Sequence, residues 1–179
     1  MHNKVVYQIA RTLDRIGAPT LRFNFRGVGL SAGKHDRGHG EQGDVRAALN
    51  YMADEFPEVP LMVAGFSFGC WVGLRVGCED RRVTELAGLG PPVDGSDFSY
   101  LTKSDKPRLF ILGEKDQYGS PKQLEELIAT FPKATQRDTK AVIVPGADHF
   151  FLGQLDEVDA ALSKWLVERH PKLAEQKPR

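Results

Sequence analysis

Residues 65–69 read Gly-Phe-Ser-Phe-Gly, and this pattern stands between an apolar run at 61–64 and a second run long enough for a helix. This is the arrangement of a sharp strand-to-helix turn that lifts a serine hydroxyl clear of a sheet. Small residues two positions before and after the serine let neighbouring backbone approach without a Cβ clash. Ser67 is therefore a candidate nucleophile, and the free N–H of Phe68 at the helix start can face a developing oxyanion. Because the chain holds 18 glycines, the pentapeptide alone could arise by chance. Its position between a predicted strand and a predicted helix is what favours a catalytic role for Ser67.

A second glycine-rich pattern offers a different chemistry. Residues 27–32 read Gly-x-Gly-x-x-Ala, a loose dinucleotide fingerprint, but that fingerprint requires a helix to begin there. The polar residues 34–40 follow instead, so we expect no nucleotide cofactor. His35, Asp36 and His39 are side chains that can hold a metal, but histidines in a glycine-flanked loop are usually solvated. We expect no metal site.

The composition sets the class of protein. The 179 residues are 41% hydrophobic, and 24 basic side chains balance 24 acidic ones, which favours one globular domain at 1–170, a polar tail at 171–179 and no nucleic-acid partner. There is no long apolar stretch and no signal-peptide core, so we expect a soluble cytoplasmic protein without a membrane partner. Cys70 and Cys78 on one helix would be about 12 Å apart, too far to bridge, and we expect buried thiols.

The elements that must position Ser67 alternate along the chain. Apolar residues at helical spacing predict helices, and short apolar or alternating runs predict strands. The predicted helices are residues 3–16, 41–56, 68–79, 121–131 and 154–169. The predicted strands are residues 20–25, 60–65, 85–90, 107–113 and 140–144. Residues 91–106 are polar without a clear period, which leaves either a short lid or a plain connector.

This alternation predicts an α/β fold with a doubly wound, mostly parallel sheet covered by helices on both faces. In such sheets ligands bind beyond the carboxyl ends of the strands. Ser67, Asp116 and His149 each follow a predicted strand, so the fold should bring all three to one rim. A serine hydroxyl needs a base to take its proton, and an imidazole base needs an acid beside it.

With the chain order Ser67, Asp116, His149, the sequence resembles the α/β-hydrolase superfamily. The resemblance covers nearly the whole chain, and in detail the sequence is similar to small bacterial dienelactone-hydrolase-like and acyl-peptidase-like esterases. It implies Ser67 as nucleophile, His149 as general base and then acid, and Asp116 as the group that orients His149. Its most specific motifs are Arg-Phe-Asn-Phe-Arg-Gly-Val-Gly-x-Ser-x-Gly at 22–33, Gly-Phe-Ser-Phe-Gly at 65–69, Gly-Glu-Lys-Asp at 113–116 and Gly-Ala-Asp-His-Phe-Phe at 146–151.

Each of these assignments has an alternative. Asp148 adjoins His149, but neighbours in sequence rarely face one another, which favours Asp116 as the acid and leaves Glu114 in reserve. Arg26 is expected to brace the loop at 26–33 rather than to bind substrate. The other histidines lie near the termini or in the polar loop: His2, His35, His39 and His170.

The resemblance also implies strands before the first helix, followed by a loop that supplies a second oxyanion N–H. Here the first predicted helix begins at residue 3, so the sheet is expected to lack its N-terminal strands. The missing strand would lie between those at 20–25 and 60–65, leaving two apolar edges unpaired. Three explanations stay open: an N-terminally shortened chain, a sheet that has closed its gap, or a partner chain that supplies the strand.

We therefore expect a serine hydrolase that cleaves small ester, thioester or activated amide bonds through an acyl-Ser67 intermediate. No cofactor is implied. The alternatives are a non-catalytic hydrolase-like scaffold and an acyltransferase. The sequence does not fix the substrate, and it leaves homo-oligomerisation open.

Overall fold

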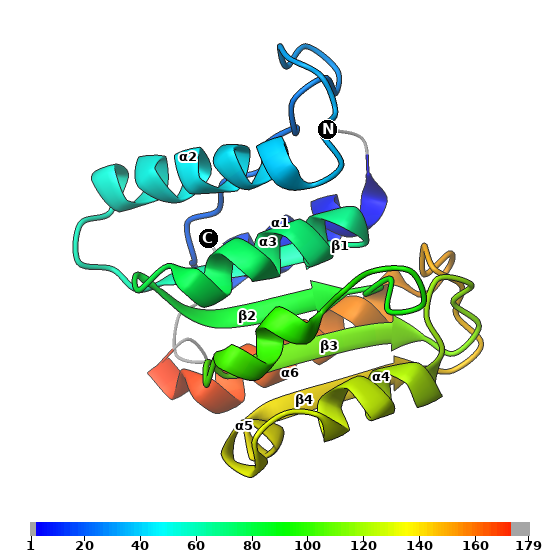
Figure 1. Ribbon diagram of the computed structural model, residues 1–179. Coiled ribbons are helices and arrows are strands. Elements are labelled where there is room, and N and C mark those ends of the chain that lie inside the picture. The colour runs from blue at the N-terminus through cyan, green and yellow to red at the C-terminus, as the bar shows by residue number, and fades with distance from the viewer. Residues whose placement is uncertain (1–2, 173–179) are drawn as a thin grey trace.

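Four parallel strands form one sheet in the order β1-β2-β3-β4 in the computed structural model, which describes residues 3–172 (Figure 1). The two central strands are buried along almost their whole length, because helices cover both faces of a parallel sheet and such strands read as continuous apolar runs. The strands are β1 Leu61–Phe66, β2 Val83–Leu89, β3 Arg108–Gly113 and β4 Thr139–Val144.

The helices begin where the sequence supplies capping groups. Asn3 accepts hydrogen bonds from the N–H groups of Val5 and Val6 at the start of α1, and Ser120 with Gln123 forms a capping box at the start of α4. The helices are α1 Lys4–Arg15, α2 His39–Glu55, α3 Phe68–Glu79, α4 Pro121–Ala129, α5 Lys133–Arg137 and α6 Leu155–Arg169, with a 3-10 turn η1 Ser99–Lys103.

Two hydrophobic clusters hold the layers together, one on each face of the sheet. Helices α1 and α6 pack on one face through residues such as Ile9 and Leu162, and they lie behind the sheet in Figure 1. Helices α2, α3 and α4 cover the other face through residues such as Leu49 and Leu74. The side chains of β3 alternate between the clusters, as the two-residue period of a strand requires.

One predicted strand is wrong. Residues 20–25 form no regular secondary structure and are not part of the sheet, which leaves β1 as an edge strand that pairs, among the described strands, only with β2. The alternating pattern is local, whereas a strand also needs a neighbour within hydrogen-bonding distance. The explanation in which the sheet closes its gap is therefore wrong as well, since residues 20–25 do not pair with β1.

The other elements occur as predicted, with ends that differ by at most two residues. The structure adds two short elements that the sequence did not predict, η1 within 91–106 and α5. Cys70 and Cys78 are free thiols, Cys70 buried and Cys78 half-buried. The predicted polar tail falls largely on residues 173–179, which lie outside the described part of the chain.

Candidate active site

The turn between β1 and α3 holds Ser67 in a backbone conformation that is unfavourable for a residue with a side chain, with φ 54° and ψ −120°. Gly65 makes this turn possible, because a Cβ there would lie 2.3 Å from the carbonyl oxygen of Gly69. A Cβ on Gly69 itself would meet only the Phe25 ring at an ordinary 3.7 Å. The close approach of the backbone on the two sides of the turn therefore depends on Gly65 and not on Gly69.

The loops after β3 and β4 pack against one another by direct backbone contact. A Cβ on Gly113 would lie 2.5 Å from the carbonyl oxygens of both Ala147 and Asp148. The N–H of Lys115 donates to the carbonyl of Ala147 at 2.8 Å. This contact brings Asp116, three positions after Gly113, next to His149, which follows Asp148.

Ser67, His149 and Asp116 form a continuous hydrogen-bonded chain. His149 Nε2 lies 2.8 Å from Ser67 Oγ, and its Nδ1 lies 2.8 Å from Asp116 Oδ2. The second carboxylate oxygen of Asp116 accepts the N–H of Tyr118 at 2.8 Å, so the acid is fixed in orientation. The side chains of His149 and Asp116 are buried, while Ser67 is half-buried and reachable. With Asp116 ionised, Nδ1 carries the ring proton and Nε2 is free to accept from the serine.

The two alternative acids, Asp148 and Glu114, accept hydrogen bonds from backbone N–H groups. Asp148 accepts the N–H groups of Phe150 and Leu152 and so caps the turn that carries His149. Glu114 accepts the N–H of Gly146. Both carboxylates therefore stabilise the loop at 145–152, and neither bonds to the His149 ring.

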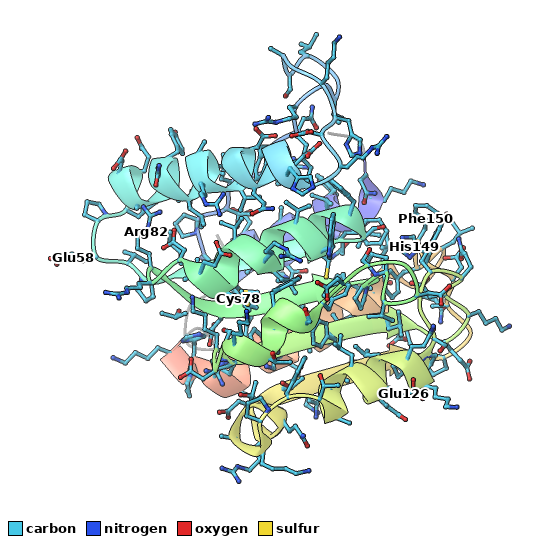
Figure 2. All side chains as sticks on the ribbon, viewed as in Figure 1. Glu58, Cys78, Arg82, Glu126, His149 and Phe150 are labelled. Atoms are coloured by element: carbon cyan, nitrogen blue, oxygen red, sulfur yellow. The ribbon has the colours of Figure 1, made fainter. Side chains whose placement is uncertain are left out.

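Three aromatic rings surround the His149 imidazole, and sequence reasoning missed them. The ring centroids of Phe66, Tyr118 and Phe150 lie 4.8, 4.6 and 5.1 Å from that of His149. Figure 2 shows His149 and Phe150 together beyond the carboxyl ends of the strands. Phe66 and Phe150 each adjoin a predicted site residue in sequence, which was an available signal. The rings confine the imidazole and keep water from its faces.

The glycine-rich loop after residues 20–25 is tied to α2 by a carboxylate. Asp44 accepts from the backbone N–H and the guanidinium of Arg26, so Arg26 braces this loop as expected. The hydrogen bond from Arg26 lowers the pKa of Asp44 below its ordinary value. The Phe25 and Phe68 rings then meet edge to face at 5.4 Å, which places the loop beside the first turn of α3.

The side chain of His35, which follows that loop, also has a partner within the protein. His35 lies 2.9 Å from the carboxylate of Glu41, which also accepts the N–H groups of Asp36 and Gly38. Within residues 3–172 no cluster of three His, Cys, Asp or Glu side chains is arranged to hold a metal ion. The helix after the loop, α2, begins only at His39, too late for the dinucleotide fingerprint.

A large apolar cavity adjoins Ser67. It has a volume of about 1030 Å³ and lies between residues 20–25 and β1, with α1 and α2 as its other walls. At one end it reaches Ser67, Phe68 and His149. This is where the resemblance placed a further strand.

Three known proteins are similar to this chain over most of its length. An α/β serine hydrolase homologue from Coxiella burnetii is 35% identical with a TM-score of 0.85, covering 93% of this chain and 77% of that one. An α/β serine hydrolase without a lid from Xanthomonas campestris is also 35% identical, with a TM-score of 0.85, covering 94% of this chain and 74% of that one. An uncharacterised protein of Rickettsia prowazekii is 33% identical over 174 residues, which are 93% of this chain and 72% of that protein.

No helix within the described residues is long and apolar enough to cross a membrane.

The sequence profile of the dienelactone hydrolase family matches residues 31–172, a span that contains Ser67, Asp116 and His149. By this match, and by the α/β-hydrolase fold that it shares with its structural relatives, the chain belongs to the dienelactone hydrolase family and is a hydrolase.

Proposed function

We propose that the chain hydrolyses small carboxylic esters, and thioesters or activated amides of similar size, through an acyl-Ser67 intermediate. The observation that supports this most directly is the chain of two 2.8 Å contacts from Ser67 through His149 to Asp116. Family membership favours an enzyme over a binding scaffold, so we do not carry the scaffold forward.

In the first half of the reaction, Ser67 Oγ attacks the carbonyl carbon while His149 Nε2 takes the hydroxyl proton. Asp116 stabilises the imidazolium that forms. The carbonyl oxygen becomes an oxyanion beside the start of α3, where the N–H of Phe68 has no acceptor within the helix. His149 then gives its proton to the departing alkoxide or thiolate, which leaves the acyl group on Ser67.

In the second half, water takes the place of the leaving group. His149 removes a proton from the water as its oxygen attacks the acyl carbon, and it returns that proton to Ser67 Oγ as the carboxylic acid departs. The N–H of Phe68 supplies one oxyanion donor at the start of α3. Removing one such donor typically costs about 100- to 1000-fold in kcat, so we expect the rate to depend strongly on the position of this N–H.

The test is hydrolysis of p-nitrophenyl acetate by the chain and by Ser67→Ala. We expect the substitution to lower kcat by at least about 1000-fold without unfolding the protein. Ser163→Ala, on α6 away from the site, is the matched control and should leave the rate unchanged. Labelling by a fluorophosphonate probe should likewise depend on Ser67. Retained turnover in purified Ser67→Ala would overturn the proposal.

The same acyl intermediate would serve an acyltransferase, which passes the acyl group to an alcohol or amine. The two activities differ in product. We expect methanol, added at a fixed concentration, to divert the acyl group only in proportion to its share of the nucleophile. Mostly ester product in dilute alcohol would identify a transferase instead.

A further inference from the structure

The imidazole of His149 has an inner side that the protein fills and an outer side that it leaves open. On the inner side Phe66 and Gly90 are both buried, and a Cβ on Gly90 would lie 3.1 Å from His149 Cε1. On the outer side stand the rings of Tyr118 and Phe150, which are 49% and 53% exposed. A bound molecule therefore reaches Nε2 from the side on which these two rings stand.

The backbone beneath both exposed rings is fixed by hydrogen bonds. The carbonyl of Tyr118 accepts the N–H of Asp94 at 3.1 Å. The N–H of Phe150 donates to the carboxylate of Asp148 at 3.0 Å, and the Phe150 ring centroid lies 5.9 Å from that of Phe66. Apolar surface that is already in place loses little conformational freedom when a ligand binds to it.

The proton path decides which part of an ester lies beside these rings. In the tetrahedral intermediate the oxyanion faces the N–H of Phe68, whereas the leaving oxygen must come within about 3 Å of His149 Nε2 to take its proton. The alcohol part of the substrate continues from that leaving oxygen. It is therefore the part nearest to Tyr118 and Phe150, whose ring centroids lie 4.6 and 5.1 Å from that of His149.

We propose that Tyr118 and Phe150 form a subsite for the alcohol part of the ester, which we call the alcohol subsite, and that it selects apolar alcohols such as benzyl alcohol. The alcohol subsite rests on the proposed hydrolysis at Ser67. An aryl group beside the two rings gains aromatic contacts and is removed from water. An anionic alcohol would lose part of its hydration there, and neither ring offers it a charged partner.

The alcohol subsite acts on the first half of the reaction only. As His149 passes the Ser67 proton to the leaving oxygen, the bond from the carbonyl carbon to that oxygen breaks and the alcohol departs. Every acetate ester then gives the same acetyl-Ser67, whose hydrolysis by water does not depend on the alcohol. A preference among alcohols must therefore appear in kcat/KM, which covers the steps up to the departure of the alcohol.

Two isomeric esters place the same benzyl group on opposite sides of the carbonyl. Benzyl acetate carries it on the alcohol and methyl phenylacetate carries it on the acyl group, and the released alcohols, benzyl alcohol and methanol, are of similar acidity. We expect Phe150→Ala to lower kcat/KM for benzyl acetate at least about 5-fold more than for methyl phenylacetate. Tyr118→Ala should act in the same direction, whereas Tyr118→Phe keeps the ring and should keep the ratio. Chromatography of the released benzyl alcohol and phenylacetic acid gives both rates.

The ratio of the two rates separates a subsite from simple support of His149. If the rings only confined the imidazole, Phe150→Ala would slow both isomers equally, because both need the same proton transfer. Leu152→Ala is the matched control, since Leu152 is 75% exposed on the same loop but does not line the cavity beside Ser67. We expect this control to change either rate by less than about twofold.

Binding of the free alcohol tests the alcohol subsite without turnover and without any substitution. We expect benzyl alcohol, titrated into the unmodified chain, to shift the NMR signals of the Tyr118 and Phe150 ring protons. Methanol at the same concentration should leave those signals in place. The methyl signals of Leu152 should respond to neither alcohol.

Three results would overturn the proposal. They are equal losses for the two isomers in Phe150→Ala, a larger loss for methyl phenylacetate, which would place the rings beside the acyl group, and ring signals that do not respond to benzyl alcohol. Failure of the proposed function has a different signature, which is the absence of Ser67-dependent turnover of either isomer and of p-nitrophenyl acetate. In that case the NMR titration still decides whether the two rings bind an apolar alcohol.

Discussion

The carboxylate of Asp116 uses each oxygen for a different partner, the N–H of Tyr118 on one side and Nδ1 of His149 on the other, both at 2.8 Å. Asp116→Asn keeps the shape of the side chain but leaves only one acceptor atom. If the N–H of Tyr118 holds that oxygen, the amide NH2 points at Nδ1. Nδ1 must then accept, the ring proton moves to Nε2, and Nε2 cannot take the proton of Ser67.

The size of the effect follows from two free-energy costs that Asp116→Asn imposes even when the amide adopts the productive orientation. Turning the amide over restores the productive tautomer but leaves the N–H of Tyr118 without an acceptor, at a cost of about 1–3 kcal/mol. The neutral amide also loses the charge-assisted hydrogen bond to the imidazolium, worth about 1.5–3 kcal/mol. Together these predict a fall in kcat on the order of 100- to 10,000-fold.

The assay is kcat for p-nitrophenyl acetate, with thermal unfolding measured on the same samples. Asp148→Asn is the matched control, because the amide oxygen can still accept from the N–H groups of Phe150 and Leu152 and the residue makes no bond to His149. We expect this control to change kcat by less than about threefold. Equal losses in the two variants, or full activity in folded Asp116→Asn, would refute the tautomer argument.

Three further predictions concern the scaffold. Gly65→Ala should destabilise the protein by at least about 2 kcal/mol because its Cβ meets backbone at 2.3 Å, whereas Gly69→Ala, whose Cβ has an ordinary contact, should not, as judged by urea unfolding. Asp44→Asn should lower the unfolding midpoint at pH 7. Because Arg26 lowers the pKa of Asp44 in the folded protein, that stabilisation is present at neutral pH and lost in acid, so thermal scans should converge as the pH falls below about 4. Cys70 should resist iodoacetamide until the protein unfolds, since burial raises the pKa of its thiol, and labelling followed by peptide mapping checks this.

The contact between Ser67, Asp116 and His149 was predictable because each residue follows a strand. Carboxyl ends of parallel strands meet at one edge, so three positions far apart in sequence converge once the strands are recognised. The roles of the three side chains stay a prediction. The aromatic enclosure was not predicted, because the approach of Tyr118 to His149 depends on the course of the loop after β3, which no local pattern encodes.

Residues 20–25 show the limit of local pattern in the opposite direction. Their alternation of Leu21, Phe23 and Phe25 with polar residues is typical of a strand, yet the segment has no regular secondary structure. It is not a strand because none of the described strands pairs with it. A local sequence pattern indicates which residues could form a strand, whereas the presence of a pairing partner is a property of the whole sheet.

Strand β1 leads directly into the turn that carries the nucleophile. Its last residue, Phe66, precedes the strained Ser67, and such strain persists only where the surroundings hold the backbone firmly. The N–H of Ser67 is held by the carbonyl of Leu89 in β2 at 2.9 Å, and its hydroxyl lies 2.8 Å from His149 in the loop after β4. The strained residue is therefore held from two other parts of the sheet, and a change that loosens either of them acts on Ser67 without touching it.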